Sequence, residues 1–176
     1  MYLRFSEYDD SLLKRPAEGR DDITEAVRSI VSDVRKRGDE ALRDYALRFD
    51  GSSLDSLFVS EREFEEAEAA VPEDLKEAIR HAGANIRRFH EAERPQEECV
   101  ETEEGVVCSR RVVPIRHVGL YVPGGTAPLF STVLMLAIPA VVAGCQDIIL
   151  ATPAKNGVVS PAILYAASSA GVGKVL

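Results

Sequence analysis

Apolar residues recur at helical spacing near the start of the chain. Asp22 followed by Glu25 is a capping-box pattern, and an apolar stripe of helical period follows it. Gly38 interrupts the stripe, which then resumes and stops at Asp50 and Gly51. This pattern predicts a helix, a break and a second helix.

Two further helices are predicted before residue 95. Ser60 with Glu63 repeats the capping signature ahead of another apolar stripe. Pro72 marks a new start, because proline suits the first turn of a helix, and the long amphipathic stripe behind it ends near Pro95. Helices therefore dominate this part of the chain.

The segment from Cys99 to Val113 carries Glu103, Glu104 and Gly105 between two short β-prone runs. A turn-forming glycine between such runs is typical of a hairpin. We expect the hairpin to join the charged helices to the more apolar remainder of the chain.

After Pro114 the pattern alternates between strand and helix. Residues 117–123 and 145–153 predict strands, residues 128–144 predict an apolar helix, and Ser160 with Pro161 opens another helix. A third strand begins at residue 174. Apolar strands joined by helices indicate parallel β-α-β units with both sheet faces covered, as in a doubly wound fold.

Charge is distributed unevenly along the 176 residues. The first hundred residues hold 25 of the 29 acidic and 16 of the 21 basic side chains, whereas residues 117–176 hold only Asp147, Lys155 and Lys174. Because charged side chains are rarely fully buried, we expect the first part to be solvated and the second to be enclosed. We therefore predict two domains, 1–113 and 114–176. A sheet of two or three strands would expose a large apolar surface, so we expect an N-terminal piece of a longer protein or a chain that pairs with another.

Composition narrows the class of partner and the compartment. A net charge of −8 without a large basic cluster argues against nucleic acid and anionic membranes, and favours a small ligand. The three cysteines form no CxxC motif, which suits a reducing cytosol. The first residues lack a signal-peptide pattern and no apolar run of membrane-spanning length is unbroken, so we expect a cytoplasmic protein.

The loop after the first apolar strand is the best candidate for a site. Residues 119–131 read GLYVPGGTAPLFS and contain no charged side chain. Ligands of parallel α/β sheets bind beyond the carboxyl ends of the strands, where paired glycines let a ligand approach the main chain. The alternative is a tight connection whose glycines satisfy geometry alone, because PGGT is neither a dinucleotide fingerprint nor a P-loop.

Candidates for catalysis are few. His81 and His90 lie nine residues apart on the long predicted helix, which is not the spacing of two metal ligands on one helix face. His117 precedes a strand and fits a surface or interface position. Cys145 fits a small buried apolar residue, because no histidine or aspartate partner is indicated.

Several segments in order resemble the histidinol dehydrogenase family. They are RGDEALRDYALRFDG, PEDLKEAIRHAGANIRRFHEAERP, RRVVPIRHVGLYVPGG, GLYVPGGTAPLFSTVLMLAIPAVVAGC and SPAILYAASSAGV. The resemblance covers the chain from about residue 22 onward. It implies incomplete Rossmann-like domains, similar to those of aldehyde dehydrogenases, in a homodimer whose sites combine both subunits.

The resemblance also implies an activity. Members of the family oxidise L-histidinol to L-histidine through an aldehyde in histidine biosynthesis, with two NAD molecules and a zinc ion. In this sequence Tyr121 matches the family's NAD-contacting tyrosine, with Pro123, Gly124, Gly125 and Thr126 beside it. Ser131 matches a serine that we expect near the substrate.

The family's catalytic machinery has no counterpart here. Its zinc ligands and its Glu-His acid/base pair lie in the later half of the enzyme, so the resemblance implies that this chain holds neither and is inactive alone. Two alternatives remain. One is an interaction module that assembles with itself or with a separate C-terminal subunit. The other is an aldehyde-dehydrogenase-like enzyme, which is disfavoured because the setting of a nucleophilic cysteine is missing.

Overall fold

The computed structural model describes residues 20–124 and 127–176, and the chain divides into two compact units, one up to Leu42 and the other Arg43–Leu176. The first unit contains α1 (Arg20–Arg37) and the start of α2 (Asp39–Asp50). Gly38 lies between them with φ +61°, so the predicted break is confirmed.

The start of α1 differs from the prediction. The helix begins at Arg20, so Asp22 lies inside it rather than before it. Acidic residues suit the first turn of a helix as well as its N-cap, because both positions face the positive end of the helix dipole. The Asp22 and Glu25 pattern therefore marked the right helix but not its first residue.

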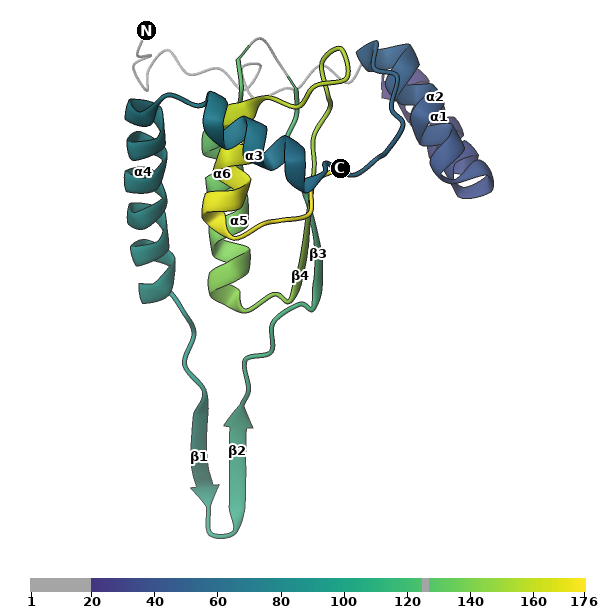
Figure 1. Cartoon of the computed structure of the whole chain (residues 1–176). Helices are drawn as coiled ribbons and strands as arrows, with labels where there is room; N and C mark the ends of the chain where they lie inside the picture. The colour runs from purple at the N-terminus through teal and green to yellow at the C-terminus, as the bar shows by residue number, and fades with distance from the viewer. Residues whose placement is uncertain (1–19, 125–126) are drawn as a thin grey trace, which may run out of the picture. The chain divides into compact units, whose positions relative to one another are not determined.

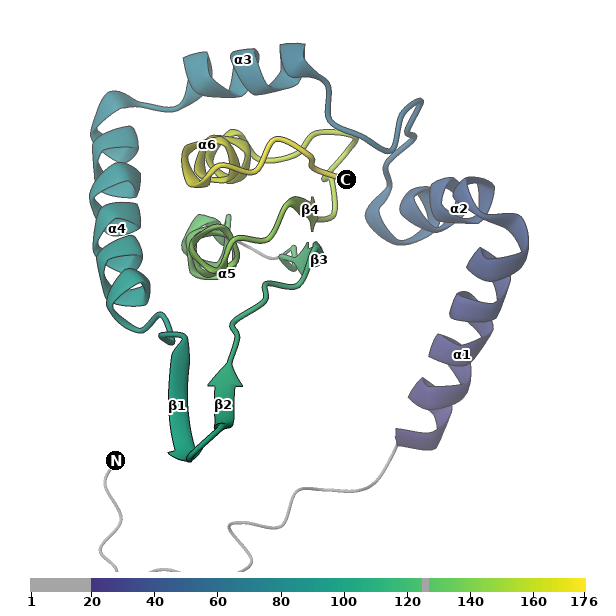
Figure 2. The same ribbon diagram turned by 90° about the horizontal axis from the view of Figure 1, so that it is seen from below.

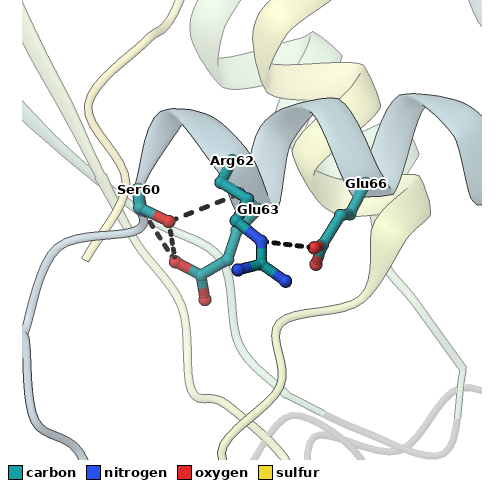
Figure 3. A network of polar contacts seen from close by, with 4 residues as sticks. All are labelled: Ser60, Arg62, Glu63 and Glu66. Atoms are coloured by element: carbon teal, nitrogen blue, oxygen red, sulfur yellow. Dashed lines mark hydrogen bonds and ion pairs between the residues drawn. The ribbon is translucent and has the colours of Figure 1, made fainter.

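In the second unit, α3 (Glu61–Ala70) begins with the capping box that the sequence predicts. The backbone N–H of Ser60 donates to Oε2 of Glu63 at 2.8 Å, and the N–H of Glu63 donates to Oγ of Ser60 at 3.3 Å (Figure 3). One turn on, Arg62 pairs with Glu66 at 2.7 Å. After Pro72 the chain enters α4 (Glu73–Ala92), as expected.

The sheet of this unit is parallel. β3 (His117–Tyr121) pairs with β4 (Asp147–Ala151), and residues 174–176 run along the other side of β4. The N–H of Leu150 donates to the carbonyl of Lys174 at 3.0 Å, and the N–H of Leu176 donates to the carbonyl of Leu150 at 2.8 Å. The expected third strand is present only as one parallel bridge, between Leu150 and Val175.

The two helices that connect the strands lie on one face of the sheet. α5 (Phe130–Ala143) and α6 (Pro161–Ala170) cover this face, and α4 and α3 pack outside them (Figures 1 and 2). Both connections cross the sheet in the same direction, and right-handed crossovers then place both helices on the same side. The shared core is made by Ile79, Val122, Val133, Leu134, Leu150, Ala166, Val172 and Val175, all almost fully buried.

The opposite face of the sheet is open, whereas the sequence predicts that both faces are covered. Gly119 and Tyr121 of β3 point away from the helix layer and are exposed, and Ile149 of β4 is only half-buried. The physical reason is the strand order, because a helix reaches the second face only when a later strand is added on the other side of β3. Within the described residues of this unit, the layers are sheet, inner helices and outer helices.

α5 is the most apolar of the helices. Pro139 lies inside it, yet the helix continues to Ala143 and ends at Gly144 with φ +89°. The proline is therefore accommodated without a break. Across residues 20–124 and 127–176, every helix is too short or too polar to cross a membrane.

The predicted hairpin is confirmed. β1 (Glu98–Glu103) and β2 (Val106–Arg110) are antiparallel, and Gly105 turns the chain with φ +80°. All residues of both strands are exposed, including Val100, Val106 and Val107. The hairpin therefore adds nothing to the buried core.

Candidate functional site

The carboxyl ends of β3 and β4 meet at a cavity of about 670 Å³. Tyr121 and Ala151 are register partners at the strand ends, so the loops after the two strands start side by side. The cavity is lined by Tyr121, Pro123, Gly124, Ala127, Pro128 and Leu129 of the first loop, by Thr152, Pro153, Ala154, Lys155, Val158 and Ser160 of the second, and by Phe49, Asp50 and Ile163. This is the sheet edge at which α/β folds bind ligands.

Three of the six residues expected to form the site lie together here. Tyr121 is 65% exposed and lines the cavity with Pro123 and Gly124. Gly125 and Thr126 lie outside the described residues. Ser131 lies in the first turn of α5, exposed and apart from the cavity lining. The structure thus brings together the residues around Tyr121, whereas Ser131 stands apart from them.

Gly124 is explained by packing between the two loops. A Cβ on this residue would lie 2.7 Å from Cγ of Pro153, closer than two carbons can approach. The proline ring cannot swing away as a flexible side chain could. Gly124 therefore allows the loops to touch directly, which shapes the cavity wall.

Thr152 is a residue that the sequence did not single out. It comes directly after β4, is 7% exposed and lines the cavity, and its Oγ1 has no hydrogen-bond partner among the described residues. Buried hydroxyls are normally hydrogen-bonded, so this enclosed group is an exception among the described residues. The signal in the sequence was a polar residue directly after an apolar strand, in the run DIILAT.

The second loop is held by a tight turn and by a distant serine. Asn156 and Gly157 have φ of +53° and +78°, and Lys155 and Val158 exchange backbone hydrogen bonds of 3.0 and 3.2 Å across them. These are the features of a two-residue type I′ turn, which the dipeptide Asn-Gly favours. Ser52 is fully buried; its hydroxyl donates to the carbonyl of Ala154 at 2.8 Å and accepts from the N–H of Gly157 at 3.0 Å.

The cavity carries one base and one acid. Lys155 and Asp50 both line it, and neither takes part in an ion pair among the described residues. The first turn of α6 also reaches the cavity through Ser160 and Ile163. Ser160 is the N-cap, as predicted, and Pro161 comes next, but the serine side chain makes no capping hydrogen bond.

Three side chains on α3 and α4 have shifted pKa values. The hydrogen bond from the hydroxyl of Ser60 lowers the pKa of Glu63 below its usual value, while hydrogen bonds to Glu66 and Glu73 raise the pKa of Arg62 and Arg80. These groups stabilise the helix surface and lie away from the cavity lining.

Each of the three histidines lies beside a polar side chain. His81 Nε2 lies 3.2 Å from the side-chain amide of Asn85, and His90 Nδ1 lies 3.0 Å from Glu93. His117 Nδ1 lies 2.9 Å from Asp147 at the amino ends of the strands. Across residues 20–124 and 127–176, no three His, Cys, Asp or Glu side chains gather as metal ligands would.

Comparison with known proteins gives a consistent result. The family model described as histidinol dehydrogenase matches residues 13–176. A histidinol dehydrogenase of Bacteroides fragilis is 52% identical over 167 residues, which is 94% of this chain and 39% of the relative. One of Campylobacter jejuni is 47% identical over 94% of this chain and 38% of its own length.

A solved structure agrees with these sequences. The crystal structure of histidinol dehydrogenase from Elizabethkingia anophelis superposes with a TM-score of 0.90 and 41% identity, over 98% of this chain and 40% of that one. The chain therefore spans about two fifths of the length of the relatives that it matches, and it shares their mixed α/β fold over that part.

Proposed function

The chain belongs to the histidinol dehydrogenase family, and we propose that it supplies the NAD-contacting part of an enzyme that oxidises L-histidinol to L-histidine through histidinaldehyde. The observation that carries this proposal is the cavity at the carboxyl ends of β3 and β4, lined by Tyr121, Pro123 and Gly124. It lies at the sheet edge where a dinucleotide is expected to bind.

The residues at this edge suit a dinucleotide. The exposed ring of Tyr121 offers a flat face for a heteroaromatic ring, and the prolines and aliphatic side chains of the lining add apolar surface beside it. We propose that Pro123, Gly124, Gly125 and Thr126 contact NAD through the loop backbone. When bound, NAD accepts the hydride that each oxidation step releases.

The remaining chemistry is assigned to residues outside this chain. We propose that the zinc ligands and the acid/base pair come from the part of the enzyme beyond residue 176, and that zinc orients the substrate there. Ser131 of α5 is proposed to face that part and L-histidinol. The 176 residues alone are then inactive.

We further propose that residues 114–176 begin an incomplete Rossmann-like domain of the aldehyde-dehydrogenase kind, preceded by a helical and hairpin domain at 1–113. The parallel order of β3, β4 and residues 174–176 supports this assignment. The complete enzyme is proposed to be a cytoplasmic homodimer that binds neither nucleic acid nor membranes, which the acidic net charge supports.

The test uses residues 1–176 joined in frame to the rest of the Bacteroides fragilis enzyme. We expect the joined protein to form NADH from L-histidinol, measured by absorbance, and the 176 residues alone to form none. Tyr121→Ala should raise the KM for NAD about tenfold, the range of one lost aromatic stack, whereas Tyr121→Phe keeps the ring and should stay near wild type.

Formation of NADH by the 176 residues alone would contradict the proposal that the zinc ligands and the acid/base pair lie outside this chain. An unchanged KM for NAD in Tyr121→Ala would remove Tyr121 from the site.

The exposed hairpin favours a second candidate function, an interaction module. Val100, Val106 and Val107 of the hairpin and Val113 and Ile115 after it are all exposed, and exposed apolar residues suit contact with another protein. The module would assemble with itself or with a separate C-terminal subunit. Sedimentation of the chain alone measures self-association, and sedimentation of its mixture with the C-terminal part of the relative measures assembly with that part. A monomer in both samples would rule this candidate out.

A further inference from the structure

We infer that Ser52 is a positioning residue for NAD, because it holds two parts of the cavity lining in place relative to each other. Ser52 does not line the cavity itself. Its hydroxyl joins the segment at the end of α2 to the turn after β4. Both segments line the cavity, α2 through Phe49 and Asp50 and the turn through Ala154 and Lys155. This role rests on the proposed function, since NAD is the ligand proposed for the cavity.

The side chain of Ser52 is fully buried, which is unusual for a polar residue. A hydroxyl has one proton to donate and lone pairs that accept. The hydroxyl of Ser52 donates to the carbonyl of Ala154 at 2.8 Å and accepts from the N–H of Gly157 at 3.0 Å. The carbonyl of Asp50 lies farther away, at 3.3 Å. The two shorter bonds therefore both reach the turn, which lies 102 and 105 residues further along the chain.

The turn leaves open the two backbone groups that Ser52 binds. Its own hydrogen bonds join the backbones of Lys155 and Val158. The carbonyl of Ala154 and the N–H of Gly157 take no part in those bonds. Both residues are only partly exposed, and backbone groups away from water need a partner. Ser52 is the partner of both groups and thereby attaches the turn to the segment that follows α2.

The backbone of Ser52 is attached to α2. Gly51, directly after the helix, has φ +64°, a left-handed conformation that commonly ends helices. The N–H of Ser52 then donates to the carbonyl of Ala46 in α2 at 3.1 Å. The turn packs against the same segment, because a Cβ on Gly157 would lie 3.9 Å from the carbonyl oxygen of Ser53. Ser52 is thus bonded to the helix through its backbone and to the turn through its side chain.

The hydroxyl of Ser52 arranges the two segments before a ligand binds. Without it, the turn keeps its own hydrogen bonds but loses its attachment to the segment after α2, so NAD would have to order the turn as it binds. Ordering a loop on binding lowers affinity even when the groups that touch the ligand are unchanged. Because the acid/base pair is proposed to lie outside this chain, we expect the loss to appear in KM and not in kcat.

The first test measures the KM for NAD and kcat of residues 1–176 joined to the rest of the Bacteroides fragilis enzyme. Ser52→Ala should raise the KM for NAD about tenfold and leave kcat within about twofold, because the hydrogen bonds that position the turn are lost. Ser52→Thr keeps the hydroxyl and should bring the KM back towards the wild-type value. Ser53→Ala is the matched control at the exposed neighbour, and it should change neither constant.

Ser52→Cys separates hydrogen bonding from packing. The thiol fills nearly the same space as the hydroxyl but is a weak donor and a weak acceptor. We expect the KM for NAD to rise severalfold in this variant as well, with a thermal midpoint close to that of the wild type. A serine that only fills space would instead give a wild-type KM in Ser52→Cys, and this result would overturn the positioning role.

The second test follows hydrogen–deuterium exchange of the joined protein by mass spectrometry. In Ser52→Ala the amide of Gly157 should exchange about tenfold faster, because it loses its acceptor. Peptides from α5, which packs in the core, should exchange at the wild-type rate. Faster exchange in α5 as well as in the turn would mean that Ser52 supports the whole fold, which contradicts a positioning role.

The outcomes distinguish the role of Ser52 from the proposed function. A raised KM for NAD in Tyr121→Ala with an unchanged KM in Ser52→Ala would overturn the positioning role alone. A raised KM in Ser52→Ala and Ser52→Cys, with an unchanged KM in Tyr121→Ala, would keep the positioning role and overturn the proposed role of Tyr121. Unchanged KM values in all three variants would contradict both.

Discussion

The two ends of the paired strands β3 and β4 differ in the contacts of their polar residues. We call the end at His117 and Asp147 the amino edge and the end at Tyr121 and Ala151 the carboxyl edge. At the amino edge, the carboxylate of Asp147 lies 2.9 Å from Nδ1 of His117 and pairs with Lys174 at 3.7 Å, so this acid has partners among the described residues. At the carboxyl edge, Lys155 has no ion pair and the hydroxyl of Thr152 no hydrogen bond among the described residues. The cavity lies at the carboxyl edge, so a ligand is expected there, whereas the carboxylate of Asp147 at the amino edge is held by partners within the chain.

The largest expected effect comes from Leu150, which is fully buried in β4 between the two edges. Leu150→Ala should lower the free energy of unfolding by about 2–5 kcal/mol, through lost burial and a cavity in the core. Urea unfolding measures this loss, which should exceed that of any substitution at either edge.

The matched control is Leu47→Ala, at a residue that is 58% exposed. It should change the free energy of unfolding by less than about 0.5 kcal/mol. Equal losses of unfolding free energy in Leu150→Ala and Leu47→Ala would contradict the position of Leu150 in the buried core.

Gly124→Ala tests the carboxyl edge itself. The new methyl would collide with Pro153, so we expect a loss of about 1–3 kcal/mol and a disturbed cavity. Gly119→Ala is the control, since a Cβ there meets nothing within 4 Å. Thermal unfolding should separate the two; a Gly124→Ala protein as stable as Gly119→Ala would show that the loops do not touch.

Ser60→Ala gives a reference for a fully satisfied polar group, away from both edges. Removing the cap should cost about 1 kcal/mol at neutral pH. The pKa of Glu63 is lowered in the folded chain from a usual value of 4.5, so its contribution is present above that value and is lost as pH falls through the lowered pKa. The difference between wild type and Ser60→Ala should therefore shrink in acid, and a difference that grows in acid would contradict the capping box.

The smallest effect is expected at the amino edge. Asp147→Asn removes the acid that pairs with His117 and Lys174, all of them substantially exposed. Exposed ion pairs contribute about 0–1 kcal/mol, so stability should hardly change. Calorimetric NAD affinity should stay the same, and a marked loss of affinity would place ligand contacts at the wrong edge.

Local patterns were enough to predict most elements of this fold. The capping box of Ser60, the hairpin around Gly105 and the alternation after Pro114 all rest on residues close in sequence, and each is found in the structure. The loop around Tyr121 could be placed at a strand end for the same reason.

Features that could not be predicted depend on contacts between distant residues. Ser52 meets Ala154 and Gly157 across more than a hundred residues, and Gly124 is required by Pro153 in another loop. The unpaired hydroxyl of Thr152 becomes visible only once its surroundings are known. The face of the sheet that stays open is set by strand order, which hydrophobic patterns along the chain do not encode.

The most direct measurement is a two-dimensional amide NMR titration of the chain with NAD. Ligand binding at the carboxyl edge predicts shifts at Tyr121, Gly124, Thr152 and Lys155, with the amides of His117 and Asp147 at the amino edge unmoved. Shifts confined to His117 and Asp147, or no shifts at NAD concentrations that saturate the joined enzyme, would contradict the assignment of the ligand to the carboxyl edge.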